Sequence, residues 1–234
     1  MPQTYYYFND RDYPINVTQE TVEITPYTFQ PDNTLWETRA LKQFFSRIDP
    51  EANVNIADIG AQSGLYSLYA KYLPRANFFA FEPFPTTFGL LNDNIALNEI
   101  NNVFPKNIAL SDSVGTATLN VCKSHFGLHT LGATPLRFSD IERVPVPTST
   151  LDAEFYEKGI PVHFIKIDTE GGEFAILHGG LQTLRTYKPV LQLEWNLTNM
   201  RQAGVSEDQL ATLLDSLGYK QIGCEDEERL FGPI

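Results

Sequence analysis

Short apolar runs alternate with amphipathic segments along most of the chain. Four runs, at residues 54–59, 77–81, 163–167 and 190–194, have the length and apolar content of buried strands. The third run is interrupted by a single charged residue, Lys166. Strands that alternate with helices predict a parallel sheet with helices on both faces.

Between the strands, apolar residues recur every three or four positions, as they do on the buried face of a helix. We expect one helix from about Thr34 to Ile48, ahead of the first strand. The later helices are marked by these apolar positions: Leu65, Leu68, Tyr69 and Tyr72; Phe88, Leu91 and Ile95; Phe174, Leu177, Leu181 and Leu184; Leu210, Leu213, Leu214 and Leu217. Two short strands after the last helix predict that the sheet ends in an antiparallel hairpin.

Two regions lack this regular alternation. Residues 1–33 are rich in Tyr, Thr, Asn and Pro, and they predict an irregular arm with one short strand at residues 22–25. Residues 103–110 and 117–121 flank a polar, glycine-containing turn, which predicts a β-hairpin between them.

Length and composition fit one soluble domain. The chain has 234 residues, of which 42% are hydrophobic, and it contains no repeat or low-complexity linker. We therefore expect one domain over residues 51–234, with an arm and helix over residues 1–50 that face the substrate. No apolar run approaches the roughly 20 residues that cross a bilayer, and the first residues do not resemble a secretory signal.

Charge and cysteine content narrow the expected partners and compartment. The 17 basic residues are outnumbered by 29 acidic ones, and the net charge of −12 disfavours a nucleic-acid substrate. Cys122 and Cys224 stand far apart without a metal-binding spacing. We expect free thiols in the cytoplasm, and one disulfide between the two cysteines stays open as an alternative.

The first candidate motif lies between the strand at 54–59 and the helix that follows it. It reads Asp58-Ile59-Gly60-Ala61-Gln62-Ser63-Gly64. Parallel sheets bind ligands beyond the carboxyl ends of their strands, and glycines let the backbone turn close to a ligand. The Gly-x-x-x-Gly spacing differs from the pyrophosphate motif of dinucleotide enzymes, and no Lys-Ser/Thr pair follows, which excludes a triphosphate loop. Taken alone, this segment fits a tight turn without a ligand equally well.

The second candidate is Glu82, which ends the strand at 77–81 and lies 24 positions after Asp58. An acidic residue at this distance, at the tip of the neighbouring strand, accepts hydrogen bonds from ribose hydroxyls. A solvated carboxylate, or one that caps the next helix, is the alternative interpretation.

Carboxylates also follow two later strands. Asp168 and Glu170 come directly after the strand at 163–167, and Glu194 ends the next one. Such groups take a proton from a hydroxyl or hold a divalent cation that acidifies it. We expect Asp168 to act in this way, whereas Glu170 and Glu194 are either its partners or solvated structural groups. Glu173 fits a first-turn helix carboxylate.

Histidines and aromatic residues are candidates for acceptor binding. His125 and His129 lie on either side of a glycine in an expected loop, where each could contact the acceptor or act as a base. Trp195, Tyr66 and the run at residues 5–8 offer aromatic faces of the kind that sugar rings stack on. Surface histidines and ordinary core packing are the alternatives.

The ordered set of motifs resembles the FkbM family of methyltransferases over residues 55–194. Each motif is common by itself, but their order along the chain is specific. The resemblance rests on these segments: Asp58-Ile59-Gly60-Ala61-Gln62-Ser63-Gly64, Phe81-Glu82-Pro83, residues 91–98, 107–112 and 146–152, residues 166–173, and Glu194. The family often has Asn-Ile where this chain has Gln62-Ser63.

The resemblance implies a fold, a cofactor and a set of site residues. The fold is a Rossmann-like class I methyltransferase, α/β, with a mostly parallel seven-stranded sheet, helices on both faces and a C-terminal antiparallel hairpin. The donor is S-adenosylmethionine, and the acceptor is usually a hydroxyl oxygen, on sugars or polyketide-type products. The implied cofactor-binding residues are Asp58, Gly60, Ala61, Gly64, Glu82, Pro83, Phe84, Asn107, Ala109 and Asp168.

The sequence therefore predicts O-methylation of a sugar, a glycan or a glycosylated metabolite. Asp168 would activate the hydroxyl directly or through Mg²⁺ held by Asp168 and Glu194, and His125, His129 and Trp195 would contact the acceptor. The alternatives are a small phenolic or polyketide acceptor, a non-catalytic cofactor-binding module and, less favoured, an NAD-dependent dehydrogenase. The oligomeric state is not predicted.

Overall fold

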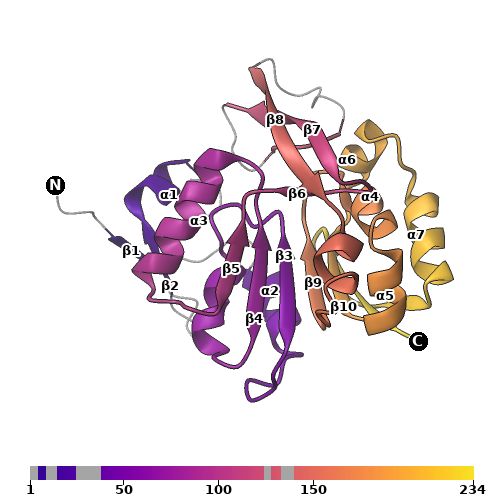
Figure 1. Ribbon diagram of the computed structural model, residues 1–234, viewed down its shortest axis with the longest axis horizontal. Coiled ribbons are helices and arrows are strands. Elements are labelled where there is room, and N and C mark those ends of the chain that lie inside the picture. Colours follow the sequence, from indigo (N-terminus) through magenta and orange to yellow (C-terminus); the bar gives the residue numbers. More distant parts are fainter. Residues whose placement is uncertain (1–4, 9–14, 25–37, 124–127, 133–139) are drawn as a thin grey trace.

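The computed structural model describes residues 5–8, 15–24, 38–123, 128–132 and 140–234 (Figure 1). Its centre is a seven-stranded sheet with the strand order β11-β12-β10-β9-β3-β4-β5. The strands are β3 (Asn55–Ile59), β4 (Asn77–Phe81), β5 (Val103–Lys106), β9 (Phe164–Ile167), β10 (Val190–Glu194), β11 (Tyr219–Glu225) and β12 (Glu228–Pro233). The five strands β10, β9, β3, β4 and β5 run parallel, and β12 pairs antiparallel with both β10 and β11. The predicted Rossmann-like sheet with its terminal hairpin is confirmed.

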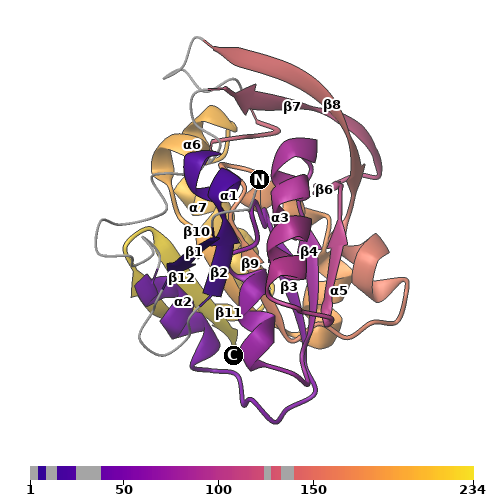
Figure 2. The ribbon, with the colours of Figure 1, turned by 90° about the vertical axis from the view of Figure 1, so that its left-hand side faces the viewer.

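Helices cover both faces of this sheet, as predicted (Figures 1 and 2). One face packs against α2 (Thr38–Phe45), the 3-10 helix η2 (Ser67–Tyr72) and α3 (Pro85–Leu97). The other packs against η3 (Asp152–Tyr156), α4 (Glu173–His178), α5 (Leu181–Tyr187), α6 (Leu197–Gln202) and α7 (Glu207–Ser216). Strand β3 contributes to both layers, since Ile56 belongs to the first apolar cluster and Ala57 and Ile59 to the second. Burial on both faces explains why the strand is mostly apolar, with Asn55 and Asp58 as its polar residues.

The apolar period at residues 174–184 predicted one helix, and that prediction is wrong. The chain forms two helices, α4 and α5, separated by Gly179 and Gly180. A Cβ on Gly179 would lie 2.2 Å from the carbonyl oxygen of Ser111, and one on Gly180 would lie 2.6 Å from Leu151 Cδ1. The two glycines therefore let the segments around Ser111 and Leu151 pack directly against the backbone. Helical periodicity cannot predict such a contact.

The predicted hairpin between residues 103–110 and 117–121 is also wrong. The first stretch divides into β5 of the main sheet and β6 (Ala109–Leu110) of a second sheet. The later stretch, β7 (Gly115–Cys122), pairs antiparallel with β8 (Ile141–Ser149) in the order β6-β8-β7. Pro145 and Pro147 interrupt the strand pattern of β8, and prolines argue against a strand when only the sequence is read.

The arm that precedes the sheet contains β1 (Tyr5–Phe8), β2 (Ile15–Thr18) and α1 (Gln19–Ile24). The strand expected at residues 22–25 is wrong, because residues 22–24 are helical; residue 25 lies outside the described residues. Strand β2 is held against α3, since Asn98 Nδ2 donates to the Asn16 carbonyl at 2.8 Å. Ile15 and Val17 join the same apolar cluster as α2 and β3. The role of residues 1–50 at the substrate site stays a prediction.

Two smaller expectations can be compared with the described residues. Cys122 is buried and Cys224 is exposed, and both are free thiols, so the alternative of a disulfide between them is wrong. No helix in the described part of the chain is long and apolar enough to span a bilayer.

Candidate functional site

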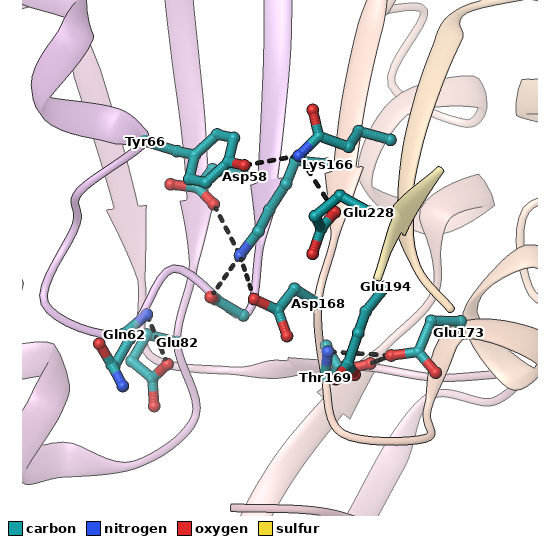
Figure 3. Close-up of polar contacts among 12 residues, drawn as sticks. Asp58, Gln62, Tyr66, Glu82, Lys166, Asp168, Thr169, Glu173, Glu194 and Glu228 are labelled. Carbon is teal, nitrogen blue, oxygen red and sulfur yellow. Dashed lines mark hydrogen bonds and ion pairs between the residues drawn. The ribbon is translucent and has the colours of Figure 1, made fainter. Parts of the chain in front are cut away.

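A cavity of about 630 Å³ opens at the carboxyl ends of the parallel strands. It is lined by the turn after β3, by Glu82 and Pro83 after β4, by residues 168–172 after β9 and by Glu194 at the end of β10. The fold thus brings together the three sets of residues that the sequence indicated separately. Figure 3 shows their polar contacts.

The turn after β3 passes very close to the β9 loop. Gly60 has a φ of +76°, and a Cβ there would lie 1.9 Å from the carbonyl oxygen of Asp168. Only glycine fits this position, for both its conformation and its space. The amides of Gly60 and Ala61 each donate to the Phe81 carbonyl at 3.0 Å, which fixes the turn against β4.

Gly64, the second glycine of the motif, packs away from the cavity surface. Its φ is +94°, and a Cβ there would lie 2.5 Å from Leu91 Cδ1. Gly64 is not among the described residues that line the cavity. The missing side chain lets α3 pack closely against the turn. Gly64 therefore has a structural role in the motif.

Glu82 is buried at the cavity wall, and the backbone of the turn holds its side chain. Its Oε2 accepts from the Gln62 amide at 2.9 Å, while Oε1 accepts from the Phe84 amide at 2.9 Å and from Thr87 Oγ1 at 2.8 Å. Burial raises the pKa of Glu82, and these hydrogen bonds act in the opposite direction. A carboxylate offers about four acceptor positions. Glu82 therefore caps the start of α3 and still has acceptor capacity for a hydroxyl.

Asp58 lies beneath the turn, and it is not among the described cavity-lining residues. Its side chain is buried, and Ser67 Oγ donates to Oδ2 at 2.6 Å. Burial raises the pKa of Asp58, and the nearby Lys166 acts against this. The structure thus gives Asp58 a supporting position below the glycine turn.

The carboxylates of Asp168, Glu170 and Glu194 converge, with one oxygen from each within 4.8 Å of the others. Asn199 Nδ2 donates to Glu170 Oε2 at 2.6 Å and to Glu194 Oε1 at 3.3 Å. Oε2 of Glu194 is buried and has no hydrogen-bond partner among the described residues. Burial, together with the negative charges of its neighbours (Asp168 first), raises the pKa of Glu194 well above the usual range of a carboxyl group.

Glu173 shapes the loop that carries two of these carboxylates. It is the first residue of α4, as the sequence predicted. Its Oε1 accepts from both the amide and the hydroxyl of Thr169 at 3.0 Å. Burial raises the pKa of Glu173. Glu170, in the same loop, has a φ of +56°, so the loop adopts a strained conformation at the cavity surface.

The residues predicted around the adenine fall into two groups. Pro83 and Ala109 line the cavity. Asn107 lies behind it, and its Nδ2 donates to the carbonyls of Glu82 and Pro83 at 2.8 and 3.0 Å. Phe84 also lies outside the described lining; its ring meets that of His129 edge-on, with 4.8 Å between the ring centroids.

The predicted acceptor contacts also divide. His129 lines the cavity, whereas His125 lies outside the described residues. Trp195 is only 5% exposed and is not among the described lining residues. Its Nε1 donates to Glu207 Oε1 at 2.8 Å, and the Arg229 guanidinium lies 4.3 Å from its ring centroid. Trp195 thus makes packing contacts in the structure, and its contact with an acceptor stays a prediction.

Two features of the site were not predicted. The acidic run 225–228, at the β11–β12 hairpin, lines the cavity together with Arg39 of α2. Lys166, the single charged residue of β9, is buried at the cavity floor, where Nζ donates to the Gly60 carbonyl at 3.1 Å. A charged residue inside an apolar strand was the signal for Lys166. The position of the acidic run depends on the topology of the terminal hairpin.

Known proteins are similar to this chain in sequence. Residues 58–220 match the family described as methyltransferase FkbM domain. Methyltransferase sdnD of Sordaria araneosa is 31% identical over 157 residues, which cover 55% of this chain. The matched part spans 61% of the length of that relative.

Two solved structures share the fold at low sequence identity. Precorrin-6y C5,15-methyltransferase from Geobacter metallireducens GS-15 has a TM-score of 0.50 and 15% identity, covering 82% of this chain and 85% of its own. TYW2 of M. jannaschii, crystallised in complex with AdoMet, has a TM-score of 0.50 and 14% identity, covering 100% of this chain and 89% of its own. The family match runs from the motif after β3 to the terminal hairpin, so the chain belongs to the methyltransferase FkbM domain family.

Proposed function

We propose that this chain transfers a methyl group from S-adenosylmethionine to a hydroxyl of a sugar, a glycan or a glycosylated metabolite. The observation that carries the proposal is the cavity at the carboxyl ends of β3, β4, β9 and β10. One side of it has the glycine turn and Glu82, and the other has three converging carboxylates. A donor site next to a proton-accepting site is what O-methylation requires.

The described residues fit the donor. Glu82 has remaining acceptor capacity for the ribose hydroxyls, and Pro83, Ile108 and Ala109 give an apolar wall for the adenine ring. Gly60 has no side chain, so the donor turn can lie directly against the Asp168 carbonyl at the cavity surface. Bound S-adenosylmethionine supplies a methyl group that is already activated. The protein must align the acceptor oxygen at about 3 Å from that methyl and accept its proton.

Glu194 is better suited than Asp168 to accept the proton. Its Oε2 has no hydrogen-bond partner among the described residues, and its raised pKa brings it closer to neutral pH, where a general base works best. Asp168 Oδ2 lies 3.3 Å from Lys166 Nζ, so this oxygen is already engaged in an ion pair. We therefore assign proton transfer to Glu194 and orientation of the hydroxyl to Asp168.

A second form of activation uses a divalent cation. The oxygens of Asp168, Glu170 and Glu194 are hard ligands of the kind that Mg²⁺ prefers, and they are close enough to share one ion after a small adjustment. In that form the ion would acidify the hydroxyl, and Glu194 would be a ligand. Full activity after exhaustive EDTA treatment would assign activation to the carboxylates alone.

The cavity wall also limits the acceptor. Leu128, Leu131, Phe174 and Val205 form an apolar side, which favours a glycosylated metabolite with an apolar part over a free sugar. The same side favours a phenolic or polyketide acceptor as the second candidate. Eight carboxylates line the described cavity against two cations, Arg39 and Lys166, which disfavours nucleic acid and other polyanions. Free thiols agree with a cytoplasmic enzyme.

The proposal is tested in two steps. Calorimetry with S-adenosylmethionine and S-adenosylhomocysteine should give saturable binding of both. Incubation with isotope-labelled S-adenosylmethionine and panels of glycosides, free sugars and phenols should then give a labelled ether, which mass spectrometry locates. Binding without any product from these panels would favour the non-catalytic module, and preferential binding of NADH would favour a dehydrogenase.

A further inference from the structure

Lys166 is the only buried lysine or arginine among the described residues. It projects from the middle of β9 toward the cavity floor, between the glycine turn and the β9 loop (Figure 3). The ring of Tyr66 lies beside it, with its centroid 5.0 Å from Nζ. A buried ammonium is costly unless charged partners and hydrogen bonds compensate it, so its contacts indicate its role.

Among the polar contacts of this ammonium with Asp58, Asp168 and Gly60, the ion pair with Asp58 is the longest. Nζ lies 3.8 Å from Asp58 Oδ1, too far for a hydrogen bond, and Oδ1 has no hydrogen-bond partner among the described residues. The shorter contacts are to Gly60, whose carbonyl lies at 3.1 Å, and to Asp168, whose Oδ2 lies at 3.3 Å. Both of these residues line the cavity. The ammonium therefore pairs with Asp58 at longer range, while its two shorter contacts are to residues of the site.

We propose that Lys166 is a positioning residue for methyl transfer, because it ties the Asp168 carboxylate to the turn that binds the donor. This inference rests on the proposed function. Through Lys166, the group that orients the acceptor is fixed relative to the group that holds the cofactor. The ion pair with Lys166 also weakens the attraction between the Asp168 carboxylate and the cationic sulfonium of the donor. The sulfonium methyl therefore stays aligned with the acceptor oxygen.

The consequence is measurable without knowing the acceptor. S-adenosylmethionine carries a positive sulfonium, whereas S-adenosylhomocysteine has a neutral thioether in its place. When Lys166 is removed, Asp168 is free to attract the sulfonium, so S-adenosylmethionine should gain affinity relative to S-adenosylhomocysteine. A packing role for Lys166 would change both affinities in the same proportion and leave their ratio unchanged.

The experiment measures the Kd of each ligand by calorimetry for the wild type and for Lys166→Met, Lys166→Gln and Lys166→Arg. For Met and Gln, we expect the ratio of the S-adenosylmethionine Kd to the S-adenosylhomocysteine Kd to fall about tenfold. For Arg, which keeps the charge, the ratio should stay within about twofold of the wild type. The Gln variant keeps a donor for the Gly60 carbonyl, so it serves as the test if Lys166→Met does not fold. Lys220→Met, at an exposed position on β11, is the matched control.

A double-mutant cycle separates positioning through Asp168 from a direct effect of the lysine charge. In an Asp168→Asn background, Lys166→Met should change the ratio by less than about twofold. An unchanged ratio in the single variants, or equal changes in both backgrounds, would overturn the inference while the proposed function stands. If the wild type binds neither ligand, the proposed function fails and the inference fails with it.

Discussion

The two halves of the cavity satisfy their polar groups in opposite ways. On the β4 side, Glu82 accepts hydrogen bonds from Gln62, Phe84 and Thr87, all within 2.9 Å. On the β10 side, Glu194 has one oxygen without a partner among the described residues and lies among other carboxylates. The first arrangement fixes a binding surface. The second arrangement makes ionisation of the buried Glu194 carboxyl unfavourable, and carboxyl groups perturbed in this way are often proton-transfer groups.

The largest expected effect concerns Glu194, on the β10 side of the cavity. Glu194→Gln removes the proposed proton acceptor and keeps the shape of the side chain, so turnover should fall about 10³-fold. The Kd for S-adenosylmethionine should change by less than about threefold, since Glu82 and the glycine turn are intact. Steady-state kinetics with the identified acceptor, combined with calorimetry, checks both numbers. Turnover close to that of the wild type would remove Glu194 from the mechanism.

On the β4 side of the cavity, we expect a substitution to change the affinity for S-adenosylmethionine. Glu82→Ala leaves three donors without their acceptor and removes the proposed ribose contact, so the Kd for S-adenosylmethionine should rise about 100-fold. Calorimetry measures the change, and Glu157→Ala, at an exposed position on the surface, is the control. Unaltered affinity in a folded Glu82→Ala variant would assign Glu82 to capping alone.

The difference between the halves should also appear in the pH dependence of stability. Because the pKa of Glu194 is raised in the folded chain, the folded state binds this proton more tightly than the unfolded state does. The stabilisation that results is complete below the ordinary carboxyl pKa of about 4.3, and it is lost as the pH rises through the raised value. Glu194→Gln does not ionise, so its free energy of unfolding should exceed that of the wild type at high pH by about 1.4 kcal/mol for each unit of the pKa shift.

Urea unfolding at a series of pH values measures this difference, with Glu157→Gln as the exposed control. The gap between Glu194→Gln and the wild type should widen as the pH rises and should close at low pH. A gap that is the same at every pH would show that the Glu194 carboxyl is not perturbed.

The smallest expected effect lies outside the cavity. Trp195→Phe removes the hydrogen bond to Glu207, so the free energy of unfolding should fall by about 1 kcal/mol. Affinity for S-adenosylmethionine should not change, because Trp195 is not among the described lining residues. Thermal unfolding and calorimetry on the same sample compare the two quantities. A large loss of donor affinity would restore Trp195 to the binding site.

The parts of the fold that local pattern determines could be predicted from the sequence. Strand β3 could be placed because it is buried on both faces, so apolar residues predominate in it. The break at Gly179 and the partner of β7 could not be placed. Both depend on segments far away in the sequence, Ser111 in one case and residues 141–149 in the other.

The candidate site follows the same division. Glu82, Asp168 and Glu194 could be named because each ends a strand of a parallel sheet, and such strand ends meet at one edge. The acidic run 225–228 lies in the terminal hairpin, which reaches the cavity only because β12 returns beside β10. Asp58 and Gly64 belong to the motif, but they support the turn and do not line the described cavity. Residue spacing alone cannot separate motif residues that line a cavity from those that support it.

The absence of a side chain at Gly60 has a consequence for redesign of the enzyme. The donor turn and the Asp168 backbone are in direct contact, so an insertion or a bulky exchange in the β9 loop would disturb donor binding as well. Four residues of the segment 128–132 (Leu128, His129, Leu131 and Gly132) and the hairpin tip at 225–228 border the same cavity from other elements. New acceptors are therefore better sought by varying those two segments while the β9 loop is kept unchanged.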